Sequence, residues 1–168
     1  MIETNIAPIT SENCHLLTPL DLFYWSLEQI VIQGQRSLDG DLRCSYRTSD
    51  DLTGNILKCA AGHCIPDDAY DPVMENIVLD TPGEPPLVPS VAGAALGHSR
   101  LNAYFNGRFS VDQLKAIKCA QLVHDNTGLI TVTDVVTIRN ITMERITAFT
   151  APNAGHLFRI ALEDFLKD

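Results

Sequence analysis

The stretch TPLDLFYWSLEQIVIQG, residues 18–34, predicts a helix whose two ends are both marked in the sequence. Thr18 is a typical N-cap, Pro19 suits the first helical position, and Asp21 stands where a capping box places its acid. Apolar residues then recur at helical spacing until Gly34, a natural C-terminal stop. Because the apolar positions exceed a single stripe, we expect this helix to be buried on more than one side.

Helices are also predicted in the second half of the chain. Ser110 and Gln113 form a capping box, which predicts a helix over 110–125. A later apolar stripe at helical spacing predicts a last helix over 152–166. Turn signals and short apolar runs confine any sheet to about 42–58, as a hairpin. The predicted fold class is therefore mainly α, or α+β with at most a small hairpin.

The length of the chain, 168 residues, suits one domain that buries its own core. We therefore predict a single compact helical domain over 1–168, with residues 1–13 as a flexible end. Residues 82–89 hold four prolines and predict an extended connector inside this domain. The small apolar residues at 91–97 favour close packing, and residues 59–65 predict a short helix that ends before a proline.

The chain carries a formal net charge of −9, and this charge is unevenly distributed. Residues 39–84 contain ten acids and three bases, which accounts for −7 of the total. A nucleic-acid binder needs the opposite sign on its contact face, so direct binding to DNA or RNA is disfavoured. The apolar runs are too short to span a bilayer, and the first residues lack the features of a signal peptide. We therefore expect no membrane partner and a location in the cytosol.

The five cysteines form an odd set without a repeated spacing: Cys14, Cys44, Cys59, Cys64 and Cys119. In a reducing compartment such residues are thiols or metal ligands, and disulfides are the less favoured interpretation. One alternative is a zinc site, whose ligands would be Cys44, Cys59, His63 and Cys64. The paired Cys-x2-Cys knuckle of most structural zinc sites is missing from the sequence. We therefore predict reduced cysteines, no bound metal and no cofactor.

Residues 59–75, which we call the motif, read CAAGHCIPDDAYDPVME and combine small, acidic and proline residues in an unusual way. The motif resembles the core of a family of small, largely uncharacterised bacteriophage and prophage proteins, Cys-Ala-x-Gly-x-x-Ile-Pro-Asp-x-x-Tyr-Asp-Pro-x-Met-Glu. The resemblance covers residues 16–76 well, including the Tyr46-Arg47 pair, and the rest of the chain thinly. It implies a mobile-element origin and the cytoplasm of a bacterial host, and it carries no known activity.

Cys59 and His124 suggest a thiol nucleophile with a nearby base. A cysteine at a helix N-terminus ionises easily, and an imidazole within reach would accept its proton. On the predicted helix His124 lies on the core-facing arc, whereas Asp125 lies on the polar arc and is poorly placed to orient it. The alternative is structural, because free cysteines and core-facing histidines are commonly buried. In that case Cys59 packs beside Gly62 in a tight apolar site.

Phosphate-binding, dinucleotide, nucleophile-elbow and paired-histidine motifs are missing from the sequence, which removes the common enzyme classes. The leading hypothesis is an accessory protein of phage or prophage origin. It would bind a host or phage protein and block or modulate it through the acidic 39–84 surface. The candidate binding residues are Asp67, Asp68, Tyr70, Asp71, Glu75, Arg43, Tyr46 and Arg47.

One alternative is a small cysteine-dependent hydrolase or transferase that uses Cys59 with His124. Another is a protein that sequesters a small molecule, for which a wet pocket rimmed by Arg43, Arg47 or Tyr46 would be the sign.

Overall fold

The structure is a computed structural model that describes residues 8–41, 43–77, 79–80 and 92–126. Its α-helices are α1 (Pro19–Gln33), α2 (Ala92–Arg108) and α3 (Val111–Asn126). Its strands are β1 (Arg47–Ser49) and β2 (Ile56–Lys58), and its 3-10 turns are η1 (Cys14–Leu16), η2 (Gly62–Cys64) and η3 (Pro72–Met74). These elements confirm the predicted fold class, mainly α with a small antiparallel hairpin. No helix within the described ranges is long and apolar enough to cross a membrane.

α1 begins and ends where its sequence predicts. The Thr18 hydroxyl accepts a hydrogen bond from the Asp21 backbone N–H (3.2 Å), and its own proton goes to the Asp21 carboxylate (2.7 Å). Gly34 ends the helix in the left-handed region (φ 82°), where glycine has no Cβ to be strained. Buried side chains cover most of the helix circumference, as expected, although Ile32 stays 66% exposed.

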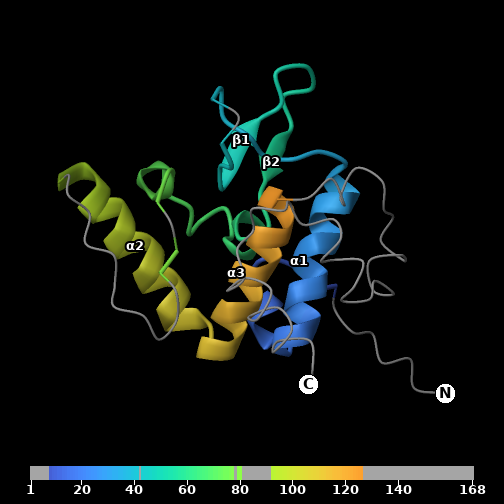
Figure 1. The fold of residues 1–168 in the computed structure, drawn as a ribbon, viewed down its shortest axis with the longest axis vertical. Helices are drawn as coiled ribbons and strands as arrows, with labels where there is room; N and C mark the ends of the chain where they lie inside the picture. The colour runs from blue at the N-terminus through green and yellow to red at the C-terminus, as the bar shows by residue number, and fades with distance from the viewer. Residues whose placement is uncertain (1–7, 42, 78, 81–91, 127–168) are drawn as a thin grey trace.

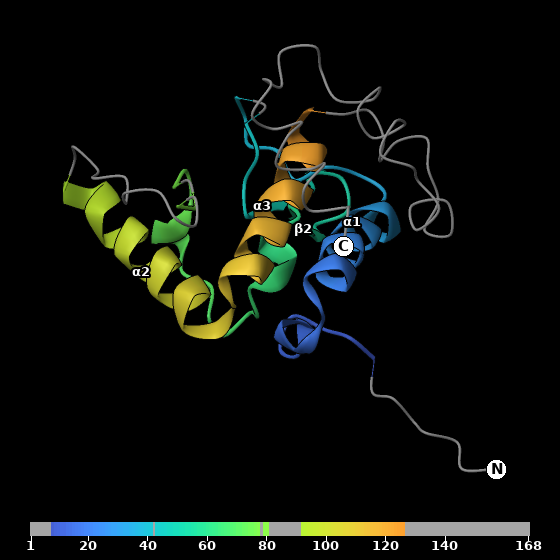
Figure 2. The same ribbon diagram turned by 60° about the horizontal axis from the view of Figure 1, so that its bottom comes forward.

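α3 packs alongside α1, and the two helices lie together in both views (Figure 1, Figure 2). The capping box predicted for α3 is present. The Ser110 N–H donates to the Gln113 side chain (2.8 Å), and the Gln113 N–H donates to the Ser110 hydroxyl (3.2 Å). The Gln113 amide also donates to the carbonyl oxygens of His15 and Leu17. One side chain therefore starts α3 and ties it to the segment just before α1.

The sequence pattern does not predict α2, although it predicts close packing for residues 91–97. Asparagines, glycines and a histidine interrupt the apolar pattern of this helix, so its helical periodicity is weak. α2 packs on η3, and a Cβ at Gly97 would overlap the carbonyl oxygen of Val73. The small residue at this position therefore allows two backbones to touch. α2 diverges from α3 beyond the turn that joins them (Figure 2).

The two strands form an antiparallel hairpin, with Arg47 opposite Lys58, that projects from the helices (Figure 1). The hairpin lies inside the predicted 42–58 region. Just before it, Cys44 forms an isolated β-bridge with Leu38, which fixes the backbone that carries the Cys44 thiol.

The short helix predicted over 59–65 is a single 3-10 turn, η2. Ile65 has an extended backbone (φ −107°, ψ 111°) because the residue before a proline avoids the helical region. The start of the turn packs tightly, since a Cβ at Gly62 would overlap the carbonyl oxygen of Tyr46. The turn therefore brings the motif against the chain that enters β1.

One apolar core runs through the described residues and takes side chains from each of their three α-helices, for example Leu22, Phe105 and Ile117. The helix predicted over 152–166, the connector predicted over 82–89 and the first seven residues of the predicted flexible end lie outside the described residues.

Candidate functional site

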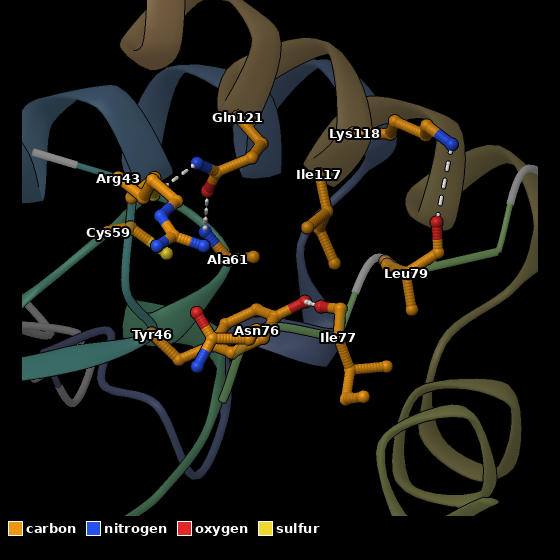
Figure 3. A pocket seen from close by; sticks show the side chains of 11 residues that line it. Arg43, Tyr46, Cys59, Ala61, Asn76, Ile77, Leu79, Ile117, Lys118 and Gln121 are labelled. Atoms are coloured by element: carbon orange, nitrogen blue, oxygen red, sulfur yellow. Dashed lines mark hydrogen bonds between the residues drawn. The ribbon is translucent and has the colours of Figure 1, made fainter. Parts of the chain in front are cut away.

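A pocket of about 300 Å³ lies beside α3, and residues from four separate stretches of chain form its walls (Figure 3). The lining residues are Arg43, Cys44, Tyr46, Cys59, Ala61, Asn76, Ile77, Leu79, Ile117, Lys118 and Gln121. Arg43 and Lys118 are cationic, and none of the lining residues that the structure describes is an aspartate or a glutamate. Ile77, Leu79 and Ile117 supply the aliphatic part of the lining. Two of the predicted binding residues, Arg43 and Tyr46, therefore belong to this pocket.

Hydrogen bonds hold the walls of the pocket together. The Tyr46 hydroxyl donates to the carbonyl oxygen of Ile77 (2.7 Å), and the Lys118 ammonium donates to the carbonyl oxygen of Leu79 (3.2 Å). Figure 3 shows both bonds reaching the same short stretch of chain, residues 76–79. This stretch is therefore anchored both to the chain before β1 and to α3.

The thiol of Cys44 meets two side chains of α3, and we call these three residues the Cys44 cluster. The Gln121 amide nitrogen is 2.9 Å from the Cys44 sulfur, and His124 Nδ1 is 3.8 Å from it. The same amide nitrogen is 3.3 Å from His124 Nδ1. A spacing of three residues puts Gln121 and His124 on one face of the helix. A thiol, an amide and an imidazole therefore converge at one point.

The Gln121 amide fixes the hydrogen-bond directions in this cluster. Its oxygen accepts a hydrogen bond from the Ala61 backbone N–H (3.0 Å), so its NH₂ group faces Cys44 and His124. An amide NH₂ group has two hydrogens to donate and accepts none. The Cys44 sulfur thus accepts one of these hydrogens. His124 Nδ1 has a single lone pair, which accepts either the other amide hydrogen or the Cys44 thiol proton.

The structure places His124 beside Cys44, whereas the pair predicted from the sequence is Cys59 with His124. His124 faces the core, as its helical position predicts, and is fully buried. The sulfur of Cys59 accepts a hydrogen bond from the Gly62 N–H (3.4 Å), and the residue is 1% exposed. Cys59 therefore has the surroundings of a packing residue, although its side chain also lines the pocket.

The other candidate binding residues near β1 form a hydrogen-bonded network around Glu75. Its carboxylate accepts hydrogen bonds from the backbone N–H groups of Tyr46 (3.0 Å) and Arg47 (2.9 Å). It also accepts one from the Tyr70 hydroxyl (2.8 Å), and burial together with this contact raises the pKa of Tyr70 to about 12. The Arg47 guanidinium lies 4.3 Å from the centre of the Tyr70 ring and donates to the carbonyl oxygen of Ile65 (3.0 Å). This network links the motif to the chain at β1.

Two acids of the motif are paired with bases of the same chain. Asp67 contacts Arg47 (2.8 Å) and Lys58 (2.9 Å), and the Lys58 hydrogen bond is the main cause that lowers the pKa of Asp67. Asp71 caps the first turn of η3 and pairs with Arg100. These carboxylates serve the fold, so they contribute less negative charge to a binding surface than the sequence alone suggests.

The remaining acids of the 39–84 region divide in the same way. Arg43 pairs with Asp39 (3.9 Å) and with Asp41. Asp51 and Asp68 are exposed and, in contrast, form no ion pair with another described residue. The acidic surface is therefore narrower than the run of acids in the sequence.

His63 is held in its neutral form by its surroundings. Burial is the largest cause that lowers its pKa, and the nearby Lys58, His124 and Arg47 lower it further, to about 3. Its Nε2 atom is buried without a hydrogen-bond partner in the part of the chain that the structure describes. Protonation would therefore place an unsolvated charge beside other cations.

The candidate zinc ligands belong to different clusters. All five cysteines are thiols in the structure. The Cys64 sulfur lies 3.7 Å from the Ser26 hydroxyl, whereas the Cys44 sulfur contacts His124. Within the described ranges, no group of three or more His, Cys, Asp or Glu side chains is placed to hold a metal ion.

Comparisons with protein-family models, with curated proteins and with solved structures find no match to this chain. The geometry of the pocket and of the Cys44 cluster therefore carries the functional interpretation.

Proposed function

We propose that the protein acts by binding, and that the pocket beside α3 holds a small molecule with a carbonyl or acidic oxygen. The lining supports this proposal, because its described residues combine aliphatic and cationic side chains and include no carboxylate. Ile77, Leu79 and Ile117 suit a short hydrocarbon portion, and Arg43 and Lys118 suit an oxygen acceptor. A volume of about 300 Å³ is at the small end of ligand sites, which favours a compact molecule.

The bracing of the walls supports the same proposal. Tyr46 and Lys118 each bond to the 76–79 stretch, and the Gln121 side chain bonds to the Ala61 N–H. A site whose walls are already bonded to one another needs little ordering when a ligand enters. Binding energy is then available for affinity rather than for closing the pocket.

Thermal unfolding of the whole chain in the presence of short-chain carboxylic acids, amides and esters tests the proposal. A ligand that binds the folded state adds about 2.7 kcal/mol to the free energy of unfolding at roughly 100 times its Kd, which raises Tm. Lys118→Met should reduce this increment, and Arg100→Met, whose side chain is outside the lining, should retain it. No increment with any of these ligands, or an equal increment in Lys118→Met, contradicts the proposal.

A protein partner is a second candidate, and the hairpin tip favours it. Leu52 is 95% exposed and lies next to the exposed Asp51, and Ile56 is 55% exposed. Acidic groups around exposed apolar side chains suit a basic protein surface. We propose that this chain is an accessory protein of phage origin. It would use these residues, together with Asp68, to bind and modulate a host protein. The resemblance of the motif to phage and prophage proteins supports the origin.

A pull-down from bacterial lysate, repeated with matched variants, tests this second candidate. Asp51→Lys with Leu52→Ser changes the hairpin tip, and Asp112→Lys changes an exposed acid at the start of α3 as the control. We expect a protein that the native chain and the control both capture, and that the hairpin variant loses. Capture of the same proteins by all three contradicts the proposal.

A further inference from the structure

The Cys44 cluster contains more chemistry than a binding pocket needs. The Cys44 side chain lines the pocket, and its sulfur contacts both the Gln121 amide and the His124 imidazole. We infer that Cys44 is a nucleophile that accepts an acyl group from a small thioester, or from a similarly activated ester, bound in the pocket. This inference rests on the proposed ligand site, because the acyl donor is the ligand held there.

Two contacts favour the ionised form of the Cys44 thiol. The Gln121 NH₂ group, whose nitrogen lies 2.9 Å from the sulfur, donates to it, and a hydrogen bond to the charged form of a group favours that form. His124 Nδ1, at 3.8 Å, is an acceptor within reach of the thiol proton. A sulfur with a fixed N–H donor and an adjacent base is the arrangement of a nucleophile.

The surroundings of the sulfur indicate the class of electrophile. Attack on an acyl carbon moves negative charge onto the carbonyl oxygen, and a fixed amide N–H next to the attacking atom stabilises that charge. The Gln121 NH₂ group lies next to the sulfur, and Ala61 fixes its orientation. The hydrogen that faces His124 Nδ1 becomes available to the carbonyl oxygen once Nδ1 has taken the thiol proton. The aliphatic side chains of Ile77 and Ile117 suit a short acyl chain. A small acyl donor therefore matches both the reacting atoms and the pocket.

The charges around the thiol agree with this chemistry. Among the residues that the structure describes, the titratable groups that line the pocket or contact the sulfur are Arg43, Lys118, His124, Tyr46 and Cys59. Arg43 and Lys118 are cations, although Asp39 and Asp41 offset the charge of Arg43. Nearby positive charge favours a thiolate over a thiol.

The acyl transfer balances without any further reactant. The Cys44 proton passes to His124 Nδ1, and the sulfur forms a bond to the acyl carbon. The bond from that carbon to the leaving sulfur or oxygen breaks, and the leaving group keeps the electron pair. The leaving group departs as a thiolate or phenolate, and the proton stays on the buried His124. The products are acylated Cys44, protonated His124 and the anion of the leaving group.

Release of the acyl group to water should be slow. A water molecule in the pocket needs a base to activate it, and His124 is fully buried and outside the lining. The lining residues within the described ranges include no histidine, aspartate or glutamate. The chain should therefore take up one acyl group rapidly and lose it slowly, as a burst followed by weak turnover.

Acylation of the full chain by S-phenyl thioacetate and by p-nitrophenyl acetate tests the inference directly. Intact mass measures the number of acetyl groups, and peptide mapping locates them. We expect one acetyl group on Cys44 and a burst of one leaving group per chain. Cys59 lines the same pocket and should stay unmodified, so it is the internal control. An adduct on another cysteine, or none, overturns the inference.

Alkylation by iodoacetamide measures the thiol without any ligand. A partly buried thiol reacts faster than free glutathione only if it is activated, and we expect Cys44 to be about tenfold faster near pH 6.5. Gln121→Glu keeps the oxygen that accepts from Ala61 and replaces the NH₂ with a carboxylate oxygen. It should move the pH profile of alkylation to higher pH with little change in Tm. A lower Tm with an unchanged profile would make Gln121 merely structural and contradict the inference.

Unreactive amides separate this inference from the proposed ligand site, because they occupy the pocket of the native chain without transferring an acyl group. Cys44→Ser should lose the acetyl adduct that the esters leave. If the native chain shows the increment without an adduct, the nucleophile fails and the ligand site stands. If it shows neither, both fail.

Discussion

The short segment 44–47 takes part in two polar clusters that use their groups in different ways. At Glu75, two backbone N–H groups and a hydroxyl share one carboxylate, and Arg47 covers the Tyr70 ring. At Cys44, an amide nitrogen and an imidazole nitrogen approach a sulfur at the wall of a pocket. In the first cluster the charged and polar groups bind one another. In the second, the Cys44 sulfur lies beside a pocket that a ligand can fill.

This contrast shows that the most distinctive segment of a sequence need not contain the reactive side chains. The motif is distinctive because its residues have partners within the fold: Gly62 touches the Tyr46 backbone, and Asp67 pairs with Lys58. The Cys44 cluster instead uses residue types that look ordinary in the sequence. We therefore expect changes in the motif to affect stability and changes in the cluster to affect reactivity.

The largest expected effect is at the close contact behind the motif. A Cβ at Gly62 would overlap the Tyr46 carbonyl oxygen, and a backbone atom cannot rotate away as a side chain can. Gly62→Ala should therefore lower the free energy of unfolding by about 3 kcal/mol or more, at the upper end of overpacking effects. Urea denaturation measures this. Gly107→Ala is the control, because its Cβ meets nothing within 4 Å and alanine is the better helix former. Equal urea midpoints for the two variants would show that the contact between Gly62 and the Tyr46 carbonyl oxygen does not stabilise the motif.

The next effect tests the carboxylate that joins the motif to β1. Glu75→Ala leaves two backbone donors and the Tyr70 hydroxyl without their acceptor, so we expect a loss of about 2–3 kcal/mol in chemical denaturation. Tyr70→Phe removes one of the three hydrogen bonds and should cost about 1 kcal/mol. Equal losses in the two variants would assign the stabilisation to the tyrosine rather than to the carboxylate.

A third effect depends on pH and comes from His63 in the middle of the motif. Its pKa in the folded chain is about 3, against 6.5 when unperturbed, so acid favours the unfolded state. The contribution should be complete above about pH 6.5 and fall by about 1.4 kcal/mol for each pH unit below it, down to about pH 3. Urea titrations between about pH 7 and 4.5 avoid most carboxylate protonation. His63→Gln should flatten the curve there, and an unchanged slope would contradict the assignment.

The smallest effect compares the two thiols of the pocket. Cys59 is 1% exposed, so Cys59→Ser puts a hydroxyl into a tight site and should cost about 1–2 kcal/mol. Cys59→Ala should be milder, because little volume is lost. Cys44 is partly exposed, and Cys44→Ser should cost less than about 0.5 kcal/mol. If Cys44→Ser lowers the stability more than Cys59→Ser in the same thermal melts, Cys44 is the packing residue, and the roles that we assign to the two thiols are wrong.

The elements that could be predicted from the sequence are those whose ends depend on neighbouring side chains. The contacts of Thr18, Gly34 and Ser110 act within one helical turn, so they can be recognised before the fold is known. α2 depends instead on a contact between distant segments, through Gly97. The apolar residues of α2 recur only weakly at helical spacing, so no local pattern predicts this helix.

The candidate site could be predicted only in part. Helical spacing is enough to direct His124 into the core, and Arg43 and Tyr46 were candidates that do line the pocket. Which thiol meets His124 depends on the path of the chain before β1. That stretch has no regular period, so no pattern in it favours Cys44 over Cys59. From the sequence, Cys44 is a candidate metal ligand and not a candidate nucleophile.

The backbone contact at Gly97 has a consequence for the life of the protein in a cell. A single methyl group at this position would push α2 away from Val73. The buried side chains of Leu101 and Phe105 would then become exposed to solvent. Chaperones and proteases respond to such surface, so small losses of stability become large losses of abundance. The cellular level of variants at position 97 would therefore report whether α2 is docked, even before any activity is known.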